Sequence, residues 1–576
     1  ERLKTGLEMM GVAADETALD RFEAFHAILD EYNARMDLTA VLDEDDVVFV
    51  ARDGFSQIQN VGFVLGARLS ANLVAAGAAG AAGLMTGTGV APLGWWLAPP
   101  LGVMVLTVAV HRSTSLRAAA AVGLAYGLGL SGPTLGWMAA IHPAALVGLL
   151  LLSSSWSAVT AVLVRAAGRS RGWPVLAALA WLGVEFLAAR VPFGGFGWLR
   201  LGYTQIDSPL AGLYPFIGVA GVSFSVVLTG QLGAWILLGP SRRRLAWSAA
   251  WLVVVTGAAT AGTVTPTPPP DGVVTAGWVQ GGAPGGGVYG LGPPRTITTN
   301  QARATRELAA AIDAGRLPAP DFVVWPENAT DLDPDTDQRT GQLVEQSVAA
   351  VGRPVLVGAI LDGPGPGQRR TAAQWREPDG RIGPTYQKRS IVPFGEWIPF
   401  RDVLLPLIPA LRYVGAQSVA GTDPGLLDVR LADGRPVRLG VLACFDVAFD
   451  PVVHDLATAQ AVIVQSNNAM YQGTAQIEQQ FAITRARAAE LRRDTLVVTT
   501  SGITGLIDPT GRVTMKVTEP GPAVGVVQLG LRTGTTTASW LATPLEVTAT
   551  VAPALWITAL TLTPSPRRRF HPLVGS

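Results

Sequence analysis

The sequence predicts a polytopic α-helical membrane domain of about eight transmembrane helices, joined to a globular region of mixed strands and helices. Only 15% of the 576 residues are charged and the mean hydropathy is +0.34, whereas soluble domains carry about a quarter charged residues. The charge is also segregated. Residues 54–270 hold 13 charged residues, of which only Glu185 and Asp207 are acidic. Charge returns after about residue 271, together with short strand and helix patterns.

The first 53 residues form a separate, acidic head. They hold 19 charged residues, of which 14 are acidic. Apolar residues spaced by three and four predict a helix over 16–50; they are Leu19, Phe22, Phe25, Leu29 and Tyr32. Residues 30–39 (DEYNARMDLT) resemble the N-terminal helical part of a small-subunit ribosomal RNA guanine methyltransferase. Because no glycine-rich cofactor-binding part follows, we expect a fused helical segment without methyltransferase activity.

Eight apolar stretches are long enough to cross a bilayer, whose core of about 30 Å needs about 20 apolar residues of helix. Their boundaries are defined to within a few residues, and they are 69–86, 94–110, 118–138, 143–164, 174–189, 211–239, 246–262 and 546–563. The alternative is a large soluble protein with buried core helices. The near absence of carboxylates from the first seven stretches argues against that alternative.

Basic residues predict the orientation of these helices, because short loops rich in arginine stay in the cytoplasm. The clusters follow the second, fourth, sixth and eighth stretches; they are Arg112 and Arg117, then Arg165, Arg169 and Arg171, then Arg242 to Arg244, then Arg567 to Arg569. We therefore expect both termini in the cytoplasm and residues 263–545 outside. Arg190 and Arg200 fall on the outer side, where we expect them to have a local task. Glu185 lies inside a helix and is either functional or a partnered structural carboxylate.

These observations divide the chain into four parts. They are the head 1–53, a seven-helix membrane domain 54–264, a catalytic domain 265–540, and the last transmembrane helix with a basic cytoplasmic tail 541–576. In the catalytic domain, apolar runs predict strands at 273–279, 321–325, 354–360, 437–444, 461–465 and 496–500. Helical patterns cover 299–314, 338–351 and 474–492. The sequence DPTG at 508–511 predicts a tight turn between two strands.

Three motifs in the catalytic domain carry reactive side chains at or near the ends of strand-like runs. In residues 321–327 (DFVVWPE) a proline ends the strand and the carboxylate of Glu327 follows. Residues 386–396 (YQKRSIVPFGE) contain Lys388, the only lysine between residues 5 and 515. In residues 439–446 (LGVLACFD) the chain's only cysteine, Cys444, ends a buried strand.

A cysteine, a glutamate and a lysine together suit acyl transfer through a thioester. A carboxylate such as Glu327 can take the thiol proton as general base. The Lys388 ammonium can lower the thiol pKa and stabilise the oxyanion of a tetrahedral intermediate. Taken singly, a buried cysteine is usually inert and strand-end charges are usually solvated. His454 could form a dyad with Cys444, but the papain-type sequence context is absent.

The order of these motifs resembles the nitrilase (carbon–nitrogen hydrolase) superfamily, and the flanking membrane helices resemble the apolipoprotein N-acyltransferase family over about residues 60–565. The matching segments include 325–327, 388, 393–396 and 444–446, with 280–281, 466–468, 485–490 and the membrane loop 195–203. The resemblance implies an extracytoplasmic α-β-β-α sandwich. It also implies that Glu327 is the general base, Lys388 the oxyanion-stabilising cation and Cys444 the acylated nucleophile.

The resemblance suggests further residues that support the site or bind substrate. They are Glu396, Asp446, Phe445, Trp325, Asn467, Trp198 and Arg200. Asp446 stands where the family often has glutamate, Phe445 where tyrosine is common, and Gly197 where proline is common. None of these departures removes a catalytic group.

The function implied is transfer of an acyl chain from a membrane phospholipid to the N-terminal amine of diacylglyceryl-cysteine lipoproteins, in the bacterial plasma membrane. Residues 397–413 form an apolar segment that is either a lid or acyl-chain wall, or packs on the membrane domain. The alternatives are a membrane-anchored amidase and a scaffold for a polyprenol-phosphate mannosyltransferase. We expect no cofactor and no metal, because the chain has one cysteine and five scattered histidines. Zero net charge argues against nucleic acid as a partner.

Overall fold

The computed structural model describes residues 72–287 and 290–562. The predicted head 1–53 and the basic tail at Arg567 to Arg569 lie outside the described residues. The chain forms two compact units that divide after Val74, and the description below concerns the second unit.

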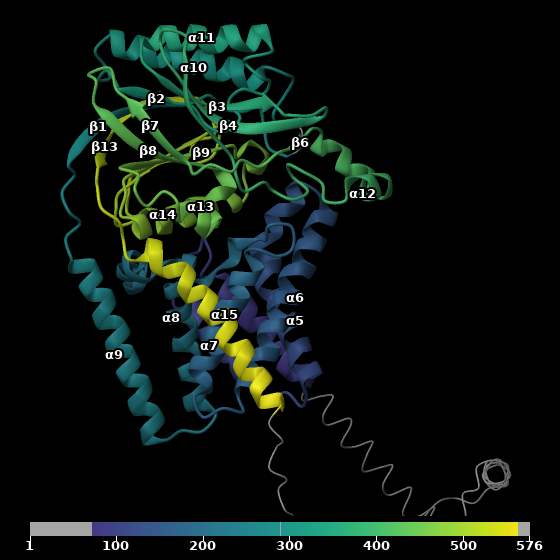
Figure 1. The fold of residues 1–576 in the computed structure, drawn as a ribbon. Helices are drawn as coiled ribbons and strands as arrows, with labels where there is room; N and C mark the ends of the chain where they lie inside the picture. The colour runs from purple at the N-terminus through teal and green to yellow at the C-terminus, as the bar shows by residue number, and fades with distance from the viewer. Residues whose placement is uncertain (1–71, 288–289, 563–576) are drawn as a thin grey trace, which may run out of the picture. The chain divides into compact units, whose positions relative to one another are not determined.

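A bundle of helices forms the lower part of this unit (Figure 1). Each predicted membrane stretch coincides with a helix, the first with the helical residues 75–87 of this unit. The others are α4 (Ala98–Arg112), α5 (Leu116–Leu135), α6 (Pro143–Ala167), α7 (Trp173–Ala188), α8 (Tyr214–Leu237), α9 (Arg242–Val264) and α15 (Ala538–Leu562). Four helical stretches of the described chain are long and apolar enough to cross a membrane, namely Leu116–Ala140, Pro143–Ala167, Pro209–Leu237 and Arg242–Val264. Helix α7 is a shorter apolar helix.

Serine side chains cap the first turns of two of these helices. The hydroxyl of Ser115 accepts a 3.1 Å hydrogen bond from the Ala118 amide at the start of α5, and Ser241 caps α9 in the same way. Helix α8 is kinked at Gly218, whose φ is 65°. A Cβ at Gly218 would lie 2.5 Å from Oε1 of Glu490. The kink therefore lets the helix backbone approach a carboxylate of the upper part.

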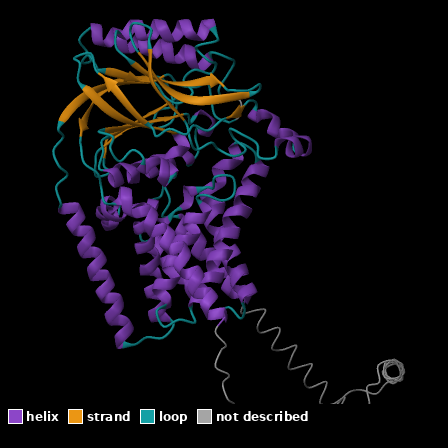
Figure 2. Cartoon of the chain, in the orientation of Figure 1, coloured by secondary structure: helices purple, strands orange, loops and turns teal. Residues whose placement is uncertain are grey.

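Two β-sheets form the upper part of the unit (Figure 2). The first has the order β13-β1-β2-β3-β4-β5, with β6 paired to β4, and the second has the order β12-β11-β10-β9-β8-β7. The strands of the first sheet are β1 (Gly272–Gln280), β2 (Phe322–Val324), β3 (Val355–Asp362), β4 (Gln368–Arg376), β5 (Ile382–Gln387), β6 (Gln417–Ser418) and β13 (Ala523–Leu531). Those of the second are β7 (Leu426–Arg430), β8 (Pro436–Ala443), β9 (Ala461–Ser466), β10 (Thr495–Thr499), β11 (Thr504–Ile507) and β12 (Val513–Val517).

Helices cover the outer face of each sheet, so the upper part is an α-β-β-α sandwich. Helices α10 (Thr296–Asp313) and α11 (Gln338–Val351) cover the first sheet, while α13 (Asp450–His454) and α14 (Gln476–Leu491) lie between the second sheet and the membrane helices (Figure 1). The core between the sheets is built of buried residues that include Phe322, Trp375, Val441, Ile463 and Val498. The predicted nitrilase-like architecture is confirmed, as is the turn at 508–511, where the Gly511 amide donates to the Asp508 carbonyl.

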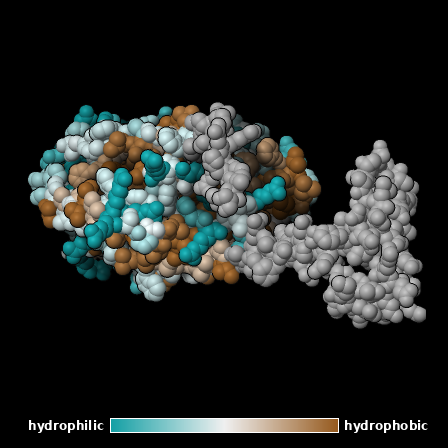
Figure 3. Space-filling model, turned by 90° about the horizontal axis from the view of Figure 1, so that it is seen from below, coloured by the Kyte–Doolittle hydropathy of each residue, from teal (hydrophilic) through white to brown (hydrophobic). Residues whose placement is uncertain are grey.

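The two parts share a hydrophobic core. Buried residues of the membrane part, such as Trp198 and Tyr214, belong to the same cluster as Phe445, Val453 and Phe481 of the sandwich. The helix layer α13–α14 is thus buried on both sides. Many large apolar side chains are exposed on the helices of the bundle, for example Leu128, Leu151 and Val253. Seen from below, hydrophilic side chains stand among apolar ones at the end away from the sheets (Figure 3).

Candidate active site

The cysteine sits at a sharp turn from strand to helix. Strand β8 ends at Ala443, and Cys444 begins the 3-10 turn Cys444–Ala448 (η6) with a φ of 49°. A positive φ is strained for a residue with a side chain, and such strain is found mainly where neighbouring structure imposes it. The thiol is half-buried. The strand end therefore presents the thiol in a fixed direction.

The lysine lies between two carboxylates. Lys388 Nζ is 2.8 Å from Glu327 Oε1 and 2.9 Å from Glu396 Oε1. The second oxygen of Glu327 accepts a 3.0 Å hydrogen bond from the Asn467 amide, and that of Glu396 accepts one of 2.8 Å from the Val392 amide. All three charged side chains are buried, so the structure brings the predicted Glu327, Lys388 and Glu396 together.

Burial and charge determine the protonation states. Burial, and then the charge of Glu327, raise the pKa of the Cys444 thiol to about 12. Burial also raises the pKa of Glu327 more than Lys388 lowers it. Burial disfavours the charged ammonium of Lys388, but Glu327 and Glu396 outweigh this effect and hold the pKa of Lys388 above its ordinary value. The cysteine is therefore a neutral thiol at rest, and Glu327 is a stronger base than an ordinary glutamate.

Asp446 joins the cysteine turn to the lysine segment. Its Oδ2 accepts hydrogen bonds from the Tyr386 hydroxyl at 2.8 Å and from the Ala443 amide at 3.0 Å. Its Oδ1 accepts one of 2.9 Å from the Ser390 amide. Asp446 is fully buried. The three hydrogen bonds replace the hydration that its carboxylate loses on burial.

A polar cluster that sequence reasoning missed lies beside the thiol. Cys444 Sγ is 3.9 Å from Gln480 Oε1, which also accepts from Asn468 at 2.8 Å and from Gln476 at 3.0 Å. The Gln480 amide donates to the Ser466 hydroxyl. Three glutamines lie on the buried face of α14, at positions 476, 479 and 480. Their spacing in the sequence could have been used to predict this cluster.

Trp325 supports the site from the core. It is fully buried, its indole donates a 3.0 Å hydrogen bond to the Thr305 hydroxyl, and its carbonyl accepts from Gln465 at 2.6 Å. These contacts fix the chain just before Glu327, and they leave no surface of Trp325 for a substrate.

The membrane loop 195–203 packs against the turn that carries the nucleophile. The ring of Trp198 stacks on Phe445, with centroids 6.0 Å apart and planes at 29°. The indole of Trp198 donates a 2.8 Å hydrogen bond to Gln479 Oε1, which also accepts from Trp137 at 3.0 Å. A Cβ at Gly197 would lie 2.7 Å from the Ala448 carbonyl. The loop therefore supports the turn that carries the nucleophile from the membrane side.

Arg200 occupies a buried ion network instead of an open surface. Its guanidinium is 2.5 Å from Asp450 Oδ2, bonds Glu546 of α15, and lies 3.8 Å from Glu185 Oε2. Arg190 pairs with the same Glu546 at 3.5 Å. Glu185 also accepts a 3.1 Å hydrogen bond from the Leu201 amide, so it is a partnered carboxylate.

The network continues into the sandwich through Arg487 on α14. This residue is 2.5 Å from both Asp450 Oδ1 and Glu490 Oε2. Glu490 Oε1 accepts from the Val219 amide at 3.2 Å, at the kink of α8, and lies 3.2 Å from His454 Nε2. His454 therefore pairs with Glu490, in keeping with the absence of a papain-type motif.

A cavity of about 380 Å³ opens beside the lysine segment. It is lined by residues of both parts, among them Phe193, Arg389, Ser390, Trp397 and Phe449. Next to it, the ring of Phe193 makes edge contacts with Phe394, Trp397 and Phe400. Helix α12 (Arg401–Leu407) follows and has no buried residue. Its Val403 is 63% exposed and its Leu407 71% exposed, so α12 itself presents apolar side chains at its surface.

The fold and the site define a carbon–nitrogen hydrolase attached to a helical membrane domain. Residues 308–538 match the carbon-nitrogen hydrolase family, and residues 82–232 match the apolipoprotein N-acyltransferase N-terminal domain. The chain belongs to the apolipoprotein N-acyltransferase family. It is 30% identical over 474 residues to the apolipoprotein N-acyltransferase of Mycolicibacterium smegmatis, which covers 78% of each chain.

Other similar proteins come from different bacteria. The apolipoprotein N-acyltransferase of Pseudomonas syringae pv. tomato is 27% identical over 462 residues, or 76% of this chain and 87% of that protein. A solved amidase from Nesterenkonia sp. superposes with a TM-score of 0.31 at 19% identity, over 45% of this chain and 90% of that chain.

Proposed function

We propose that this protein transfers an acyl chain from a membrane phospholipid to the N-terminal amine of diacylglyceryl-cysteine lipoproteins, through a thioester on Cys444. The observation that carries the proposal is the burial of Lys388 between Glu327 and Glu396, in a domain whose nucleophile turn packs on a membrane loop. Membership of the family supports the same reaction.

The first half-reaction forms the thioester. The Cys444 sulfur attacks an ester carbonyl of the phospholipid while Glu327 takes the thiol proton, because a thiol of pKa about 12 is not ionised beforehand. Lys388 stabilises the oxyanion of the tetrahedral intermediate. The carbon–oxygen bond then breaks, and Glu327 returns the proton to the departing lysophospholipid hydroxyl.

The second half-reaction releases the acyl group. The lipoprotein amine attacks the thioester carbonyl, Glu327 accepts a proton from the nitrogen, and Lys388 again stabilises the oxyanion. The carbon–sulfur bond breaks and the sulfur of Cys444 recovers the proton. One acyl group passes from an oxygen to a nitrogen in two half-reactions at the same nucleophile, so the kinetics are ping-pong.

The remaining site residues are positioning residues in this scheme. Glu396 holds Lys388 in place, and the backbone N–H of Asn467 orients Glu327. Asp446 joins the turn that carries Cys444 to the segment that carries Lys388. Trp198 and Phe445 stack on each other and hold the turn of the nucleophile against the membrane loop. Arg200 anchors the membrane loop through Asp450 and Glu546.

The proposed location is the bacterial plasma membrane, with eight spans in all. The four-part division at residues 53, 264 and 540 belongs to this proposal, as do an extracytoplasmic catalytic domain and cytoplasmic termini. Basic residues at the lower end of the helices support it, since Arg242 begins α9 at the end away from the sheets (Figure 1).

Both substrates are amphiphiles, and the apolar segment around α12 suits them. Its exposed Phe400, Val403 and Leu407 form a surface that can enter the lipid headgroup region as a lid or acyl-chain wall. The 380 Å³ cavity beside it leads toward Ser390, which bonds Asp446.

A thioester-trapping experiment tests the proposal. The protein is incubated with one defined phospholipid and no acceptor. The mass of the peptide that carries Cys444 is then measured by mass spectrometry. A long-chain acyl adduct is expected, with none in Cys444→Ala. Hydrolysis of a small amide with no lipid adduct would favour the membrane-anchored amidase. Acyl transfer that survives in Cys444→Ala would contradict both enzymes. No family match supports a mannosyltransferase partner.

A further inference from the structure

The cavity of about 380 Å³ beside the lysine segment is suited to a part of a substrate that does not react. None of the reactive residues of the proposed mechanism is among the residues that line it. It borders their site, because its lining residues Arg389 and Ser390 follow Lys388 directly in the chain. The Ser390 amide also donates a 2.9 Å hydrogen bond to Asp446 Oδ1, at the turn of the nucleophile.

Arg389 is the only charged residue of the described chain that lines this cavity. Its Nη1 is 2.5 Å from Asp455 Oδ2, while its Nε and Nη2 bond no residue that the structure describes. An arginine has five N–H donors, so most of them remain for a ligand. The side chain of Asp455 is 44% exposed, and an ion pair with such a group is weak. The guanidinium of Arg389 can therefore bind a second anion at little cost.

Two serine hydroxyls add donors to the wall of the cavity. The Ser418 hydroxyl accepts a 3.1 Å hydrogen bond from Arg369 Nε, so its own proton is left for a ligand. The Ser390 hydroxyl bonds no described residue. No carboxylate of the described chain lines the cavity. The wall thus combines one cation with neutral donors, and it suits an anion whose oxygens accept several hydrogen bonds.

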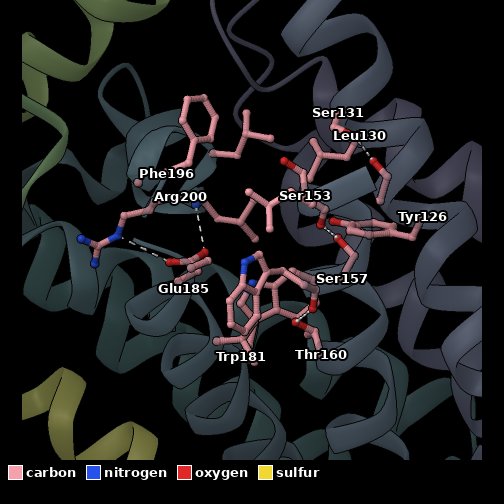
Figure 4. A pocket seen from close by; sticks show the side chains of 18 of the residues that line it. Tyr126, Leu130, Ser131, Ser153, Ser157, Thr160, Trp181, Glu185, Phe196 and Arg200 are labelled. Carbon is pink, nitrogen blue, oxygen red and sulfur yellow. Dashed lines mark hydrogen bonds and ion pairs between the residues drawn. The ribbon is translucent and has the colours of Figure 1, made fainter. Parts of the chain in front are cut away.

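The other cations around the site are committed to carboxylates. Lys388 lies between two buried carboxylates. Arg200 is 3% exposed and lies beside Glu185 in the ion network (Figure 4). Arg487 is buried in the same network. Of these cations and Arg389, only Arg389 lines the cavity, and only it has room for a substrate anion.

The chemistry of the two substrates decides which anion this is. A phospholipid donor carries a phosphodiester, which only the glycerol carbons separate from its ester carbonyls, whereas a diacylglyceryl-cysteine acceptor carries no phosphate. Arginine binds phosphate oxygens through charge-assisted hydrogen bonds and can do so in a bidentate way. When the ester carbonyl lies at Lys388, the phosphate lies a few atoms away, and Arg389 is the next residue.

We propose that Arg389, with the hydroxyls of Ser390 and Ser418, binds the phosphodiester of the acyl donor and makes the first half-reaction specific for phospholipids. This inference rests on the proposed acyl transfer and names the part of the donor that the enzyme recognises. Arg389 determines specificity in this scheme and does not touch the reacting atoms.

Thioester formation from two acyl donors tests the assignment. One donor is dipalmitoyl phosphatidylethanolamine, and the other is p-nitrophenyl palmitate, which carries the same acyl chain and no phosphate. The rate of acylation of Cys444 is measured by mass spectrometry for the full chain in detergent micelles. Arg389→Gln should lower the ratio of the phospholipid rate to the nitrophenyl ester rate by about ten- to hundredfold. Arg389→Lys should restore part of the ratio, because it keeps the charge and loses the bidentate geometry.

Asp455→Asn should act in the opposite direction. It removes the carboxylate that shares the guanidinium of Arg389, so the same ratio should rise by about two- to fivefold. The matched control is Arg438→Gln, because Arg438 forms a similar ion pair with the exposed Asp428 and does not line the cavity. Its ratio should be that of the wild type, and thermal unfolding checks that all four variants are folded.

The outcomes separate this inference from the proposed function. If the wild type is acylated by the nitrophenyl ester and not by the phospholipid, the proposed function fails, and the inference fails with it. If the phospholipid acylates the wild type and Arg389→Gln has an unchanged ratio, only the inference is wrong. A lower ratio in both Arg389→Gln and Asp455→Asn would mean that their ion pair merely supports the fold, which would also overturn it.

Discussion

Arg487 Nε donates a 2.9 Å hydrogen bond to the carbonyl of Val447, the third residue after Cys444. The same guanidinium neutralises Asp450 and Glu490, so one side chain connects the turn of the nucleophile to the ion network below it. We expect Arg487→Met to lose about 3–5 kcal/mol of stability, because two buried carboxylates each lose one charged partner, which leaves Asp450 with Arg200 and Glu490 with His454. Thermal unfolding measures this loss.

The Arg487 variant should also form the acyl-enzyme more slowly with little change in phospholipid KM, since Arg487 positions the turn and does not touch substrate. The matched control is Arg485→Lys two residues earlier. Arg485 pairs with Asp207, which is 60% exposed, so the change should cost less than about 1 kcal/mol. Equal effects of the two variants would show that the link to Val447 has no special role.

Lys388→Met should slow acyl transfer on the order of 10²–10³-fold, because it removes an oxyanion-stabilising group. It should also make stability depend on pH. Without the ammonium, burial raises the folded-state pKa of Glu327 still further above its unfolded value. A carboxyl group whose pKa is higher in the folded state than in the unfolded state destabilises the fold when it is ionised. The loss of stability of Lys388→Met relative to the wild type should therefore be largest at neutral pH. It should shrink as the pH falls through the folded-state pKa of Glu327.

Thermal unfolding of Lys388→Met and the wild type at neutral and acidic pH measures this deficit. The double variant Lys388→Met with Glu327→Gln is the control, because removing the carboxylate charge should restore most of the stability at neutral pH. A deficit that does not change with pH would contradict the buried ion pair.

The single cysteine allows its thiol to be titrated directly. With a pKa of about 12, the thiolate fraction of Cys444 should rise about tenfold for each pH unit across the neutral and mildly alkaline range, and alkylation by iodoacetamide should rise with it. In the same protein unfolded in denaturant, the alkylation rate should level off above the ordinary thiol pKa of about 8.5. A plateau in the folded protein at that ordinary value would contradict the effects of burial and of Glu327.

Asp446→Asn should destabilise the site, because three donors converge on that carboxylate. An amide nitrogen would meet one of these donors, at a cost of about 1–3 kcal/mol. Tyr386→Phe removes only one donor and should cost about 1 kcal/mol. Unfolding temperatures and rates of thioester formation distinguish the two. The exposed Asp433→Asn serves as control and should change neither, and a larger effect of Tyr386→Phe than of Asp446→Asn would contradict the bonding pattern.

The reactive residues could be predicted from the sequence because Glu327 closely follows the fully buried strand β2, and Cys444 follows the five buried residues that end β8. Strand β7 was missed because it has five residues, of which only Leu427 and Val429 are buried. Strand β4 was missed because it carries Arg369, Arg370 and Arg376 among its apolar residues.

The ion network could not be predicted, because its partners are far apart in the sequence. Arg200 is 250 residues from Asp450 and 346 residues from Glu546, and no local pattern reports a pairing over such separations. The sequence did indicate a local task for Arg200, and it left Glu185 as either a functional residue or a partnered structural carboxylate. Which partners they have depends on the packing of α7, α13 and α15, which is a property of the folded chain.

Strands β1 and β13 pair antiparallel from Gly272 opposite Leu531 to Gln280 opposite Ala523. The chain therefore enters and leaves the sandwich at one place, between the end of α9 and the start of α15. In topological terms the whole sandwich is a single insertion in the loop between two membrane helices. Its gain or loss as one cassette would leave the order of the helices intact, so a free-standing hydrolase and a helical bundle could have been joined in one genetic event.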